Sequence, residues 1–156
     1  FLPDMAGSPV FRAAQKSVWL LWVMAYVQSL LHRVSPDFMY KMIFASAQSA
    51  DQTLCQTPRF KDQIGRLIGR CLHGQRDEYR RDIMAYVTPW ATEIPVAQMP
   101  VKLWHGTLDN WSPPAMSVAL KSALGPEAQI KVCDGASHYS TLKIALDAIS
   151  NVPATV

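Results

Sequence analysis

Two side chains with acid–base chemistry, Asp109 and His138, stand 29 residues apart, and each follows an apolar run that breaks at a glycine three positions before it. A carboxylate that accepts a hydrogen bond from one imidazole nitrogen fixes the tautomer of the ring and stabilises its cation. The second ring nitrogen can then take a proton from a nucleophile. The two residues therefore have the types expected of the acid and the base of a catalytic triad.

The segments around this pair predict a strand, a helix and a second strand. Val101 to His105 and Gln129 to Cys133 are short apolar runs, and residues 113–124 between them have helical spacing and end at Gly125. Such a crossover joins neighbouring parallel strands, which lie about 4.8 Å apart. The loops that leave their carboxyl ends are then close enough for a carboxylate to hydrogen-bond an imidazole.

In order and spacing, the segments Val101 to Asp109 and Asp134 to His138 resemble the last two strands of an α/β-hydrolase. That family orders its triad as nucleophile, acid, histidine, so the resemblance implies Asp109 as triad acid and His138 as triad base. The clear match spans residues 90–150, and the helical stretch before it is similar in placement to the lid of the family.

The chain departs from that family because it has no Gly-x-Ser-x-Gly and no glycine-flanked Cys or Asp on a strand-to-helix turn. It also opens on Phe1 and enters the lid-like region almost at once. We therefore expect a truncated, carboxyl-terminal portion of a hydrolase, inactive alone, in which the sixth strand that would pair with residues 101–105 is missing. An open strand edge invites pairing with another chain, so a homo-oligomer or strand swap is expected.

Residues 10–88 predict helices and no strand. The most apolar stretch, Ser17 to Leu31, is shorter than a membrane span and contains Gln28 and Ser29. It predicts a helix that is buried between other helices or lies over a substrate pocket. Further helices are expected over residues 37–47, from Pro58 to Gly74, and over residues 76–86 before Thr88-Pro89-Trp90.

Composition excludes several classes of function. A 156-residue chain with 49% hydrophobic residues suits a compact fold, and a net charge of +3 demands neither nucleic acid nor an anionic membrane. Cys55, Cys71 and Cys133 are odd in number and lack zinc spacing, which favours free thiols, a reducing cytoplasmic compartment and no metal site. No cofactor is expected.

The basic residues of the helical region alternate with acids. Arg66, Arg70, Arg76, Arg80 and Arg81 are interleaved with four carboxylates, which is typical of a solvated helix face with local ion pairs rather than a nucleic-acid surface.

The remaining candidates have ordinary structural explanations. His105 predicts a packed strand histidine, and His32 and His73 are expected to interact with the terminal carbonyls of helices. Among the aromatic residues, Trp111 is the one predicted to line a substrate pocket, because it lies two residues after the acid. Ser112, Ser137 and Ser140 are the serines nearest the pair, and none sits on a nucleophile turn.

The expected fold class is thus α/β, with a mostly helical lid-like region over residues 1–95 and a strand-helix-strand-helix unit with two parallel strands over residues 96–156. The expected function is that of a hydrolase portion whose parent cleaves a carboxylic ester or related small apolar substrate. Two alternatives stay open. One is a non-catalytic helical binding module derived from a hydrolase, and the other is a membrane-associated helix that rests on residues 17–31 alone.

Overall fold

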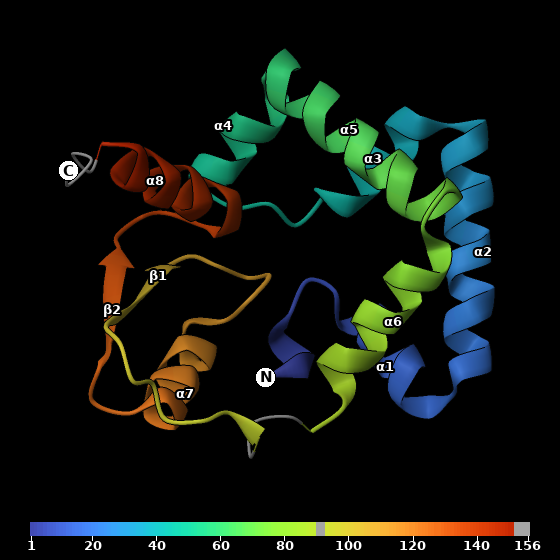
Figure 1. The fold of residues 1–156 in the computed structure, drawn as a ribbon. Coiled ribbons are helices and arrows are strands. Elements are labelled where there is room, and N and C mark those ends of the chain that lie inside the picture. Colours follow the sequence, from blue (N-terminus) through green and yellow to red (C-terminus); the bar gives the residue numbers. More distant parts are fainter. Residues whose placement is uncertain (90–92, 152–156) are drawn as a thin grey trace.

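The structure, a computed structural model, describes residues 1–89 and 93–151. Within these ranges the fold is α/β and mostly helical, with eight α-helices, one short 3-10 helix and two strands (Figure 1). In chain order the elements are η1 (Leu2–Asp4), α1 (Ser8–Lys16), α2 (Val18–Val34), α3 (Pro36–Ile43), α4 (Ala50–Gln56), α5 (Pro58–His73), α6 (Arg76–Val87), β1 (Val101–Gly106), α7 (Pro114–Leu124), β2 (Ala128–Cys133) and α8 (His138–Ser150).

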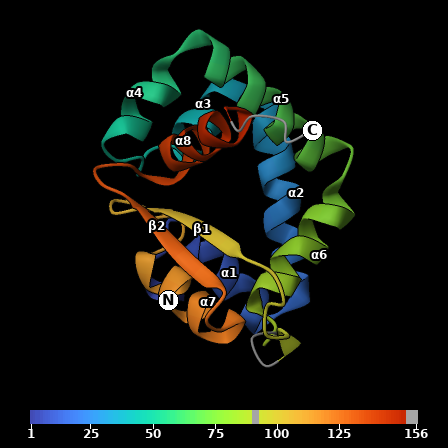
Figure 2. The same cartoon turned by 60° about the vertical axis from the view of Figure 1, so that its left-hand side comes forward.

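The two strands form a parallel sheet, as the sequence predicts. Val101 pairs with Ala128 at one end and Gly106 pairs with Cys133 at the other. The carboxyl ends of β1 and β2 therefore coincide, and the loops that carry Asp109 and His138 leave from the same edge. In both views the strands lie between α7 and α8 (Figures 1 and 2), with α8 contacting β1 and α7 contacting both strands.

Proline and glycine set several helix ends. Pro36, Pro58 and Pro114 occupy the first position of α3, α5 and α7, where a missing backbone N–H has no intrahelical partner to lose. Gly125 follows α7 with a φ of 84°, a left-handed value that glycine adopts without strain. These are the positions at which the sequence predicts the helices to begin or end.

A buried core cluster connects the helices of the first half of the chain to α8. Tyr40, Phe44, Ala47 and Cys55 form a buried cluster, against which further apolar and aromatic side chains pack. These are Ile43, Phe60, Ile64, Ile68, Trp111 and Tyr139. Because Trp111 follows β1 and Tyr139 belongs to α8, the cluster holds the helical region against the loops that carry Asp109 and His138.

Several boundaries differ from the predictions. The segment predicted as one helix over residues 37–47 ends at Ile43, and a separate helix, α4, follows after a turn. In α3 the buried side chains are Met39 and Tyr40, whereas Phe38 and Met42 face solvent. Helix α6 ends at Val87, directly before Thr88 as expected, while Trp90 of the predicted stop signal lies outside the described residues.

Of the two placements predicted for Ser17 to Leu31, burial between other helices is wrong, while a position over a substrate pocket stays a prediction. The segment does form a helix, α2, but only Leu21, Ala25 and Ser29 on it are buried. Trp19 is 74% exposed and Val34 is 77% exposed. In the described part of the chain, no helix has the length and hydropathy needed to cross a membrane.

The remaining predictions on single side chains are mostly confirmed. All three cysteines are free thiols. Within α5, Arg66 forms an ion pair with Asp62 at 2.8 Å. Within α6, Arg80 pairs with Asp77 at 2.8 Å and Arg81 pairs with Glu78 at 3.1 Å.

Candidate acid–base site

Asp109 is held by the loop that follows β1. One carboxylate oxygen, Oδ1, accepts hydrogen bonds from the backbone N–H groups of Trp111 and Ser112, both at 2.9 Å. The residue is buried, with only 8% of its surface exposed. The carboxylate therefore has one oxygen fixed by its own loop and one oxygen, Oδ2, directed to another partner.

That partner is His138, the first residue of α8. Its Nδ1 lies 2.9 Å from Asp109 Oδ2. An ionised carboxylate can only accept hydrogen bonds, so Nδ1 carries a proton and donates a hydrogen bond to Asp109. When the ring is neutral, Nε2 is therefore its basic nitrogen. The His138 side chain is 40% exposed, and no described residue hydrogen-bonds Nε2.

The electrostatics of Asp109 favour its charged form. Burial is the largest influence and acts to raise the pKa of this carboxyl group. The hydrogen bond from His138, the backbone N–H of Ser112, the charge of His138 and the backbone N–H of Trp111 all act in the other direction. Together they outweigh burial, so the pKa of Asp109 is lowered from its ordinary value.

Close packing of the two loops brings the pair together. A Cβ placed on Gly106 would overlap the carbonyl oxygen of Ala136 and the hydroxyl of Thr141, so only glycine fits at this strand end. The backbone N–H of Leu108 donates to Ala136 O at 2.9 Å, and the N–H of Gly135 donates to the Thr107 hydroxyl at 2.9 Å. These contacts set the distance between the acid loop and the base loop.

Asp51, at the start of α4, is a functional candidate that sequence reasoning missed. It is fully buried, and its two carboxylate oxygens accept hydrogen bonds from the backbone N–H groups of Tyr139 and Ser140 at 2.9 and 2.7 Å. These two donors belong to the first turn of α8, where helix N–H groups have no intrahelical acceptor. Asp51 therefore anchors the turn that carries His138, from a position 87 residues earlier in the chain.

Two further hydrogen bonds fasten the segment before α4 to both loops. Asn110 Nδ2 donates to Ser46 O at 2.7 Å, next to the acid, and the Ser49 hydroxyl donates to Gly135 O at 2.9 Å, next to the base. Ser49 has a φ of 48°, which is uncommon for a residue with a Cβ. No local pattern marks this segment. An Asp at a helix start is ordinarily interpreted as a cap of its own helix, and here it caps another.

Aromatic side chains surround the pair on the side of the helical region. The Trp111 ring centroid lies 6.2 Å from that of His138, and the Tyr139 centroid lies 5.2 Å from it. Burial is the main reason that the pKa of Tyr139 is raised to about 12, so this phenol stays neutral at physiological pH. Trp111 is half-buried against Phe44 and remains the predicted substrate contact.

The other predicted candidates, one histidine and three serines, lie near this site. His105 is a packed strand histidine, as expected, because its Nε2 donates to Ser112 O at 2.7 Å and its Nδ1 contacts the Ser117 hydroxyl. Ser112, Ser137 and Ser140 make no hydrogen bond to His138 among the described residues. Over residues 1–89 and 93–151, no three His, Cys, Asp or Glu side chains gather to hold a metal ion.

The chain matches no protein-family model, no curated protein and no solved structure with which it was compared. The chemistry of the site therefore has to be inferred from its own geometry.

Proposed function

We propose that this chain carries the acid and the general base of a hydrolase active site, with Asp109 orienting His138 for action on a carboxylic ester or a related small apolar acyl substrate. On this proposal the chain corresponds to the carboxyl-terminal portion of an α/β-hydrolase, and α1 to α6 correspond to its lid. The proposal assigns the catalytic nucleophile to none of these 156 residues, because no Gly-x-Ser-x-Gly turn occurs among them.

One observation carries the proposal: the 2.9 Å hydrogen bond between Asp109 Oδ2 and His138 Nδ1 at the carboxyl ends of adjacent parallel strands. The acid is buried and held by two backbone N–H groups, while the base is part-exposed with Nε2 unengaged by any described residue. This combination fits a base that must receive a proton from an incoming group. A purely structural ion pair has no need of an unengaged basic nitrogen.

Hydrolysis of p-nitrophenyl acetate tests the base directly, because an accessible neutral imidazole attacks this activated ester without another nucleophile. His138→Ala should lower the protein-dependent rate about tenfold or more. Asp109→Asn should lower it too, because an amide N–H that donates to Nδ1 favours the tautomer with its proton on Nε2, which then cannot attack. His32→Gln removes a different imidazole and is the matched control. Equal losses in the His138 and His32 variants would refute an activated base.

A fluorophosphonate tests where the nucleophile lies. Intact mass should show no covalent adduct on the folded chain, because no described serine hydrogen-bonds His138. An adduct that disappears in His138→Ala would mean that a serine of this chain acts as nucleophile, contrary to the proposal.

The exposed apolar face of α2 favours a second candidate, a non-catalytic module that uses its helices to bind a partner. Val18, Trp19, Trp22, Tyr26 and Leu30 on this helix are each about half exposed or more. Contiguous exposed apolar surface of this kind marks interaction sites. The ester assay separates the two functions, because a binding module has no reason to lose activity specifically with His138.

A further inference from the structure

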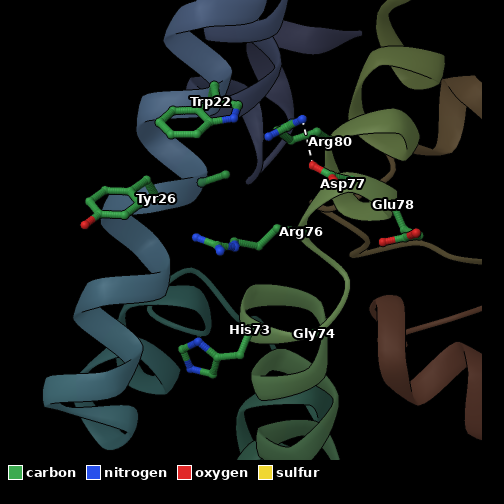
Figure 3. A pocket seen from close by; sticks show the side chains of 9 residues that line it. Trp22, Tyr26, His73, Gly74, Arg76, Asp77, Glu78 and Arg80 are labelled. Carbon is green, nitrogen blue, oxygen red and sulfur yellow. Dashed lines mark ion pairs between the residues drawn. The ribbon is translucent and has the colours of Figure 1, made fainter.

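A pocket of about 390 Å³ lies between α2 and the junction of α5 with α6, well away from Asp109 in the sequence and not lined by it (Figure 3). Its volume is in the range of small-molecule sites. The residues that line it are Trp22, Ala25, Tyr26, His73, Gly74, Arg76, Asp77, Glu78 and Arg80. A smaller pocket of about 140 Å³ adjoins it through Tyr26 and Arg76 and reaches Ser29, Leu30 and Arg33.

Basic side chains from three helices gather at the two pockets: His73 and Arg76 line the larger one, Arg33 and Arg76 line the smaller one, and His32 hydrogen-bonds His73. His32 and Arg33 come from the last turn of α2, His73 ends α5, and Arg76 begins α6. His73 Nε2 lies 2.9 Å from His32 Nδ1, and Arg33 Nε donates to His73 Nδ1 at 3.3 Å. The two histidines thus lie at helix ends as predicted, but they hydrogen-bond each other rather than terminal carbonyls.

The hydrogen bonds determine which ring nitrogen of His73 carries the proton. A guanidinium can only donate, so His73 Nδ1 is an acceptor and Nε2 carries the proton toward His32. The pKa of His73 is lowered, first by burial and then by its neighbours His32, Arg33 and Arg76.

The two acids that line the pocket, Asp77 and Glu78, form ion pairs with arginines of α6. Asp77 pairs with Arg80 at 2.8 Å, and Glu78 pairs with Arg81 at 3.1 Å. Within residues 1–89 and 93–151, neither Arg33 nor Arg76 forms an ion pair with an Asp or Glu. In Figure 3 the Arg76 side chain extends across the pocket toward α2, apart from both acids. The cationic groups are therefore arranged for a negative charge that the described protein does not supply.

One wall of the same pocket is aromatic. The rings of Trp22 and Tyr26 are parallel, with centroids 6.0 Å apart, and they remain 47% and 51% exposed. The Arg80 guanidinium lies over the Trp22 ring, 6.0 Å from its centroid. The aromatic surface that stays exposed beside the guanidinium groups can hold a planar apolar body while a cation binds its charged group. A metal ion does not fit here, because two histidines without a third His, Cys, Asp or Glu ligand among the described residues are flanked by arginines.

We propose that the two adjoining pockets between α2 and α6 bind a small aromatic oxyanion. Its charged group lies on Arg76, which lines both pockets, and on Arg33 of the smaller one, and its ring packs on Trp22 and Tyr26. Arginine matches the oxygens of a phosphate or carboxylate in a bidentate manner, which accounts for two guanidinium groups at one end of an apolar wall. The proposal does not depend on the acid–base pair of Asp109 and His138.

Titration of the whole chain with phenyl phosphate, followed by tryptophan fluorescence and by NMR of the Trp22 indole N–H, tests this proposal. Saturable binding is expected, and Arg76→Ala should weaken it about tenfold or more, because charge-assisted hydrogen bonds are lost. Arg66→Ala removes an exposed arginine of α5 and is the matched control, for which unchanged affinity is expected. Circular dichroism establishes that both variants are folded, and Arg76→Lys should bind with intermediate affinity.

Two ligand controls separate charge from apolar contact. Phenol retains the ring without the charge, and inorganic phosphate retains the charge without the ring, so both should bind more weakly than phenyl phosphate. Benzoate competing at the same site would support the general oxyanion class. The absence of saturable binding, equal weakening in the Arg76 and Arg66 variants, or phenol binding as tightly as phenyl phosphate would overturn the proposal.

Discussion

At the scale of single residues, Asp109 combines burial with a lowered pKa, because four interactions with the charged form outweigh the cost of desolvation. A carboxyl group whose pKa is lower in the folded state than its unfolded value of about 3.9 stabilises the fold above that value. The contribution is lost as the pH falls through the folded pKa. Asp109 is therefore both the orienting acid of the proposed site and a source of acid sensitivity.

Replacement Asp109→Asn should show this linkage. At neutral pH the variant should be less stable by about 1–3 kcal/mol, since hydrogen bonds to a buried charge are weakened. On lowering from about pH 6 to about pH 3 the wild type should lose more stability than the variant, so the difference between them should shrink. Urea unfolding at several pH values measures the difference in the free energy of unfolding between the two proteins. Asp62→Asn, on the exposed face of α5, is the control, and a difference that stays constant with pH would contradict the expectation.

At the scale of elements, the base is positioned by a helix whose first turn is capped from outside. Asp51 of α4 supplies one oxygen to each of two N–H groups of α8, so an amide in its place can satisfy only one of them. Asp51→Asn is therefore expected to cost about 1–2 kcal/mol of stability and Asp51→Ala at least as much.

The same variant should also change the chemistry. If Asp51 positions His138, Asp51→Asn should reduce the hydrolysis of p-nitrophenyl acetate under conditions where the protein is still fully folded by circular dichroism. Added stabilising osmolyte should restore stability without restoring the rate. A folded variant with the wild-type rate would limit Asp51 to a structural role.

At the scale of the whole molecule, the described sheet has two strands, and its outer edges pair with no other described strand. Parallel sheets are ordinarily larger and covered on both faces, and a single pair of strands offers little stability of its own. Exposed apolar side chains add to this on β2 and α8, including Val132, Leu142 and Ile149. A surface of this kind favours association.

We expect the isolated chain to form oligomers through the open edge of β1. Light scattering at micromolar concentration should give a mass above that of one chain. A double variant, Trp19→Ser with Val34→Ser, removes apolar surface from α2 and should leave the mass unchanged. A monomeric wild type would contradict the expectation, and a double variant that alone becomes monomeric would move the interface to α2.

Much of the local structure and the acid–base pair follow from the sequence itself. The strand-helix-strand unit is determined by apolar runs, a helical repeat and the stop at Gly125, all of which act between near neighbours in the chain. A parallel crossover then places the two strand ends at one edge, so the contact of Asp109 with His138 could be predicted from 29 residues of local pattern.

Only the tertiary structure decided the rest. Asp51 caps α8 through a hydrogen bond between residues 88 positions apart in the chain. The hydrogen bond of His32 with His73 joins residues 41 positions apart. Burial of α2 between other helices was likewise predicted wrongly, because apolarity gives the tendency of a helix to be covered and not which neighbours are present to cover it. Such contacts depend on how whole elements pack in three dimensions, and periodicity within one segment carries no information about the partner that meets it.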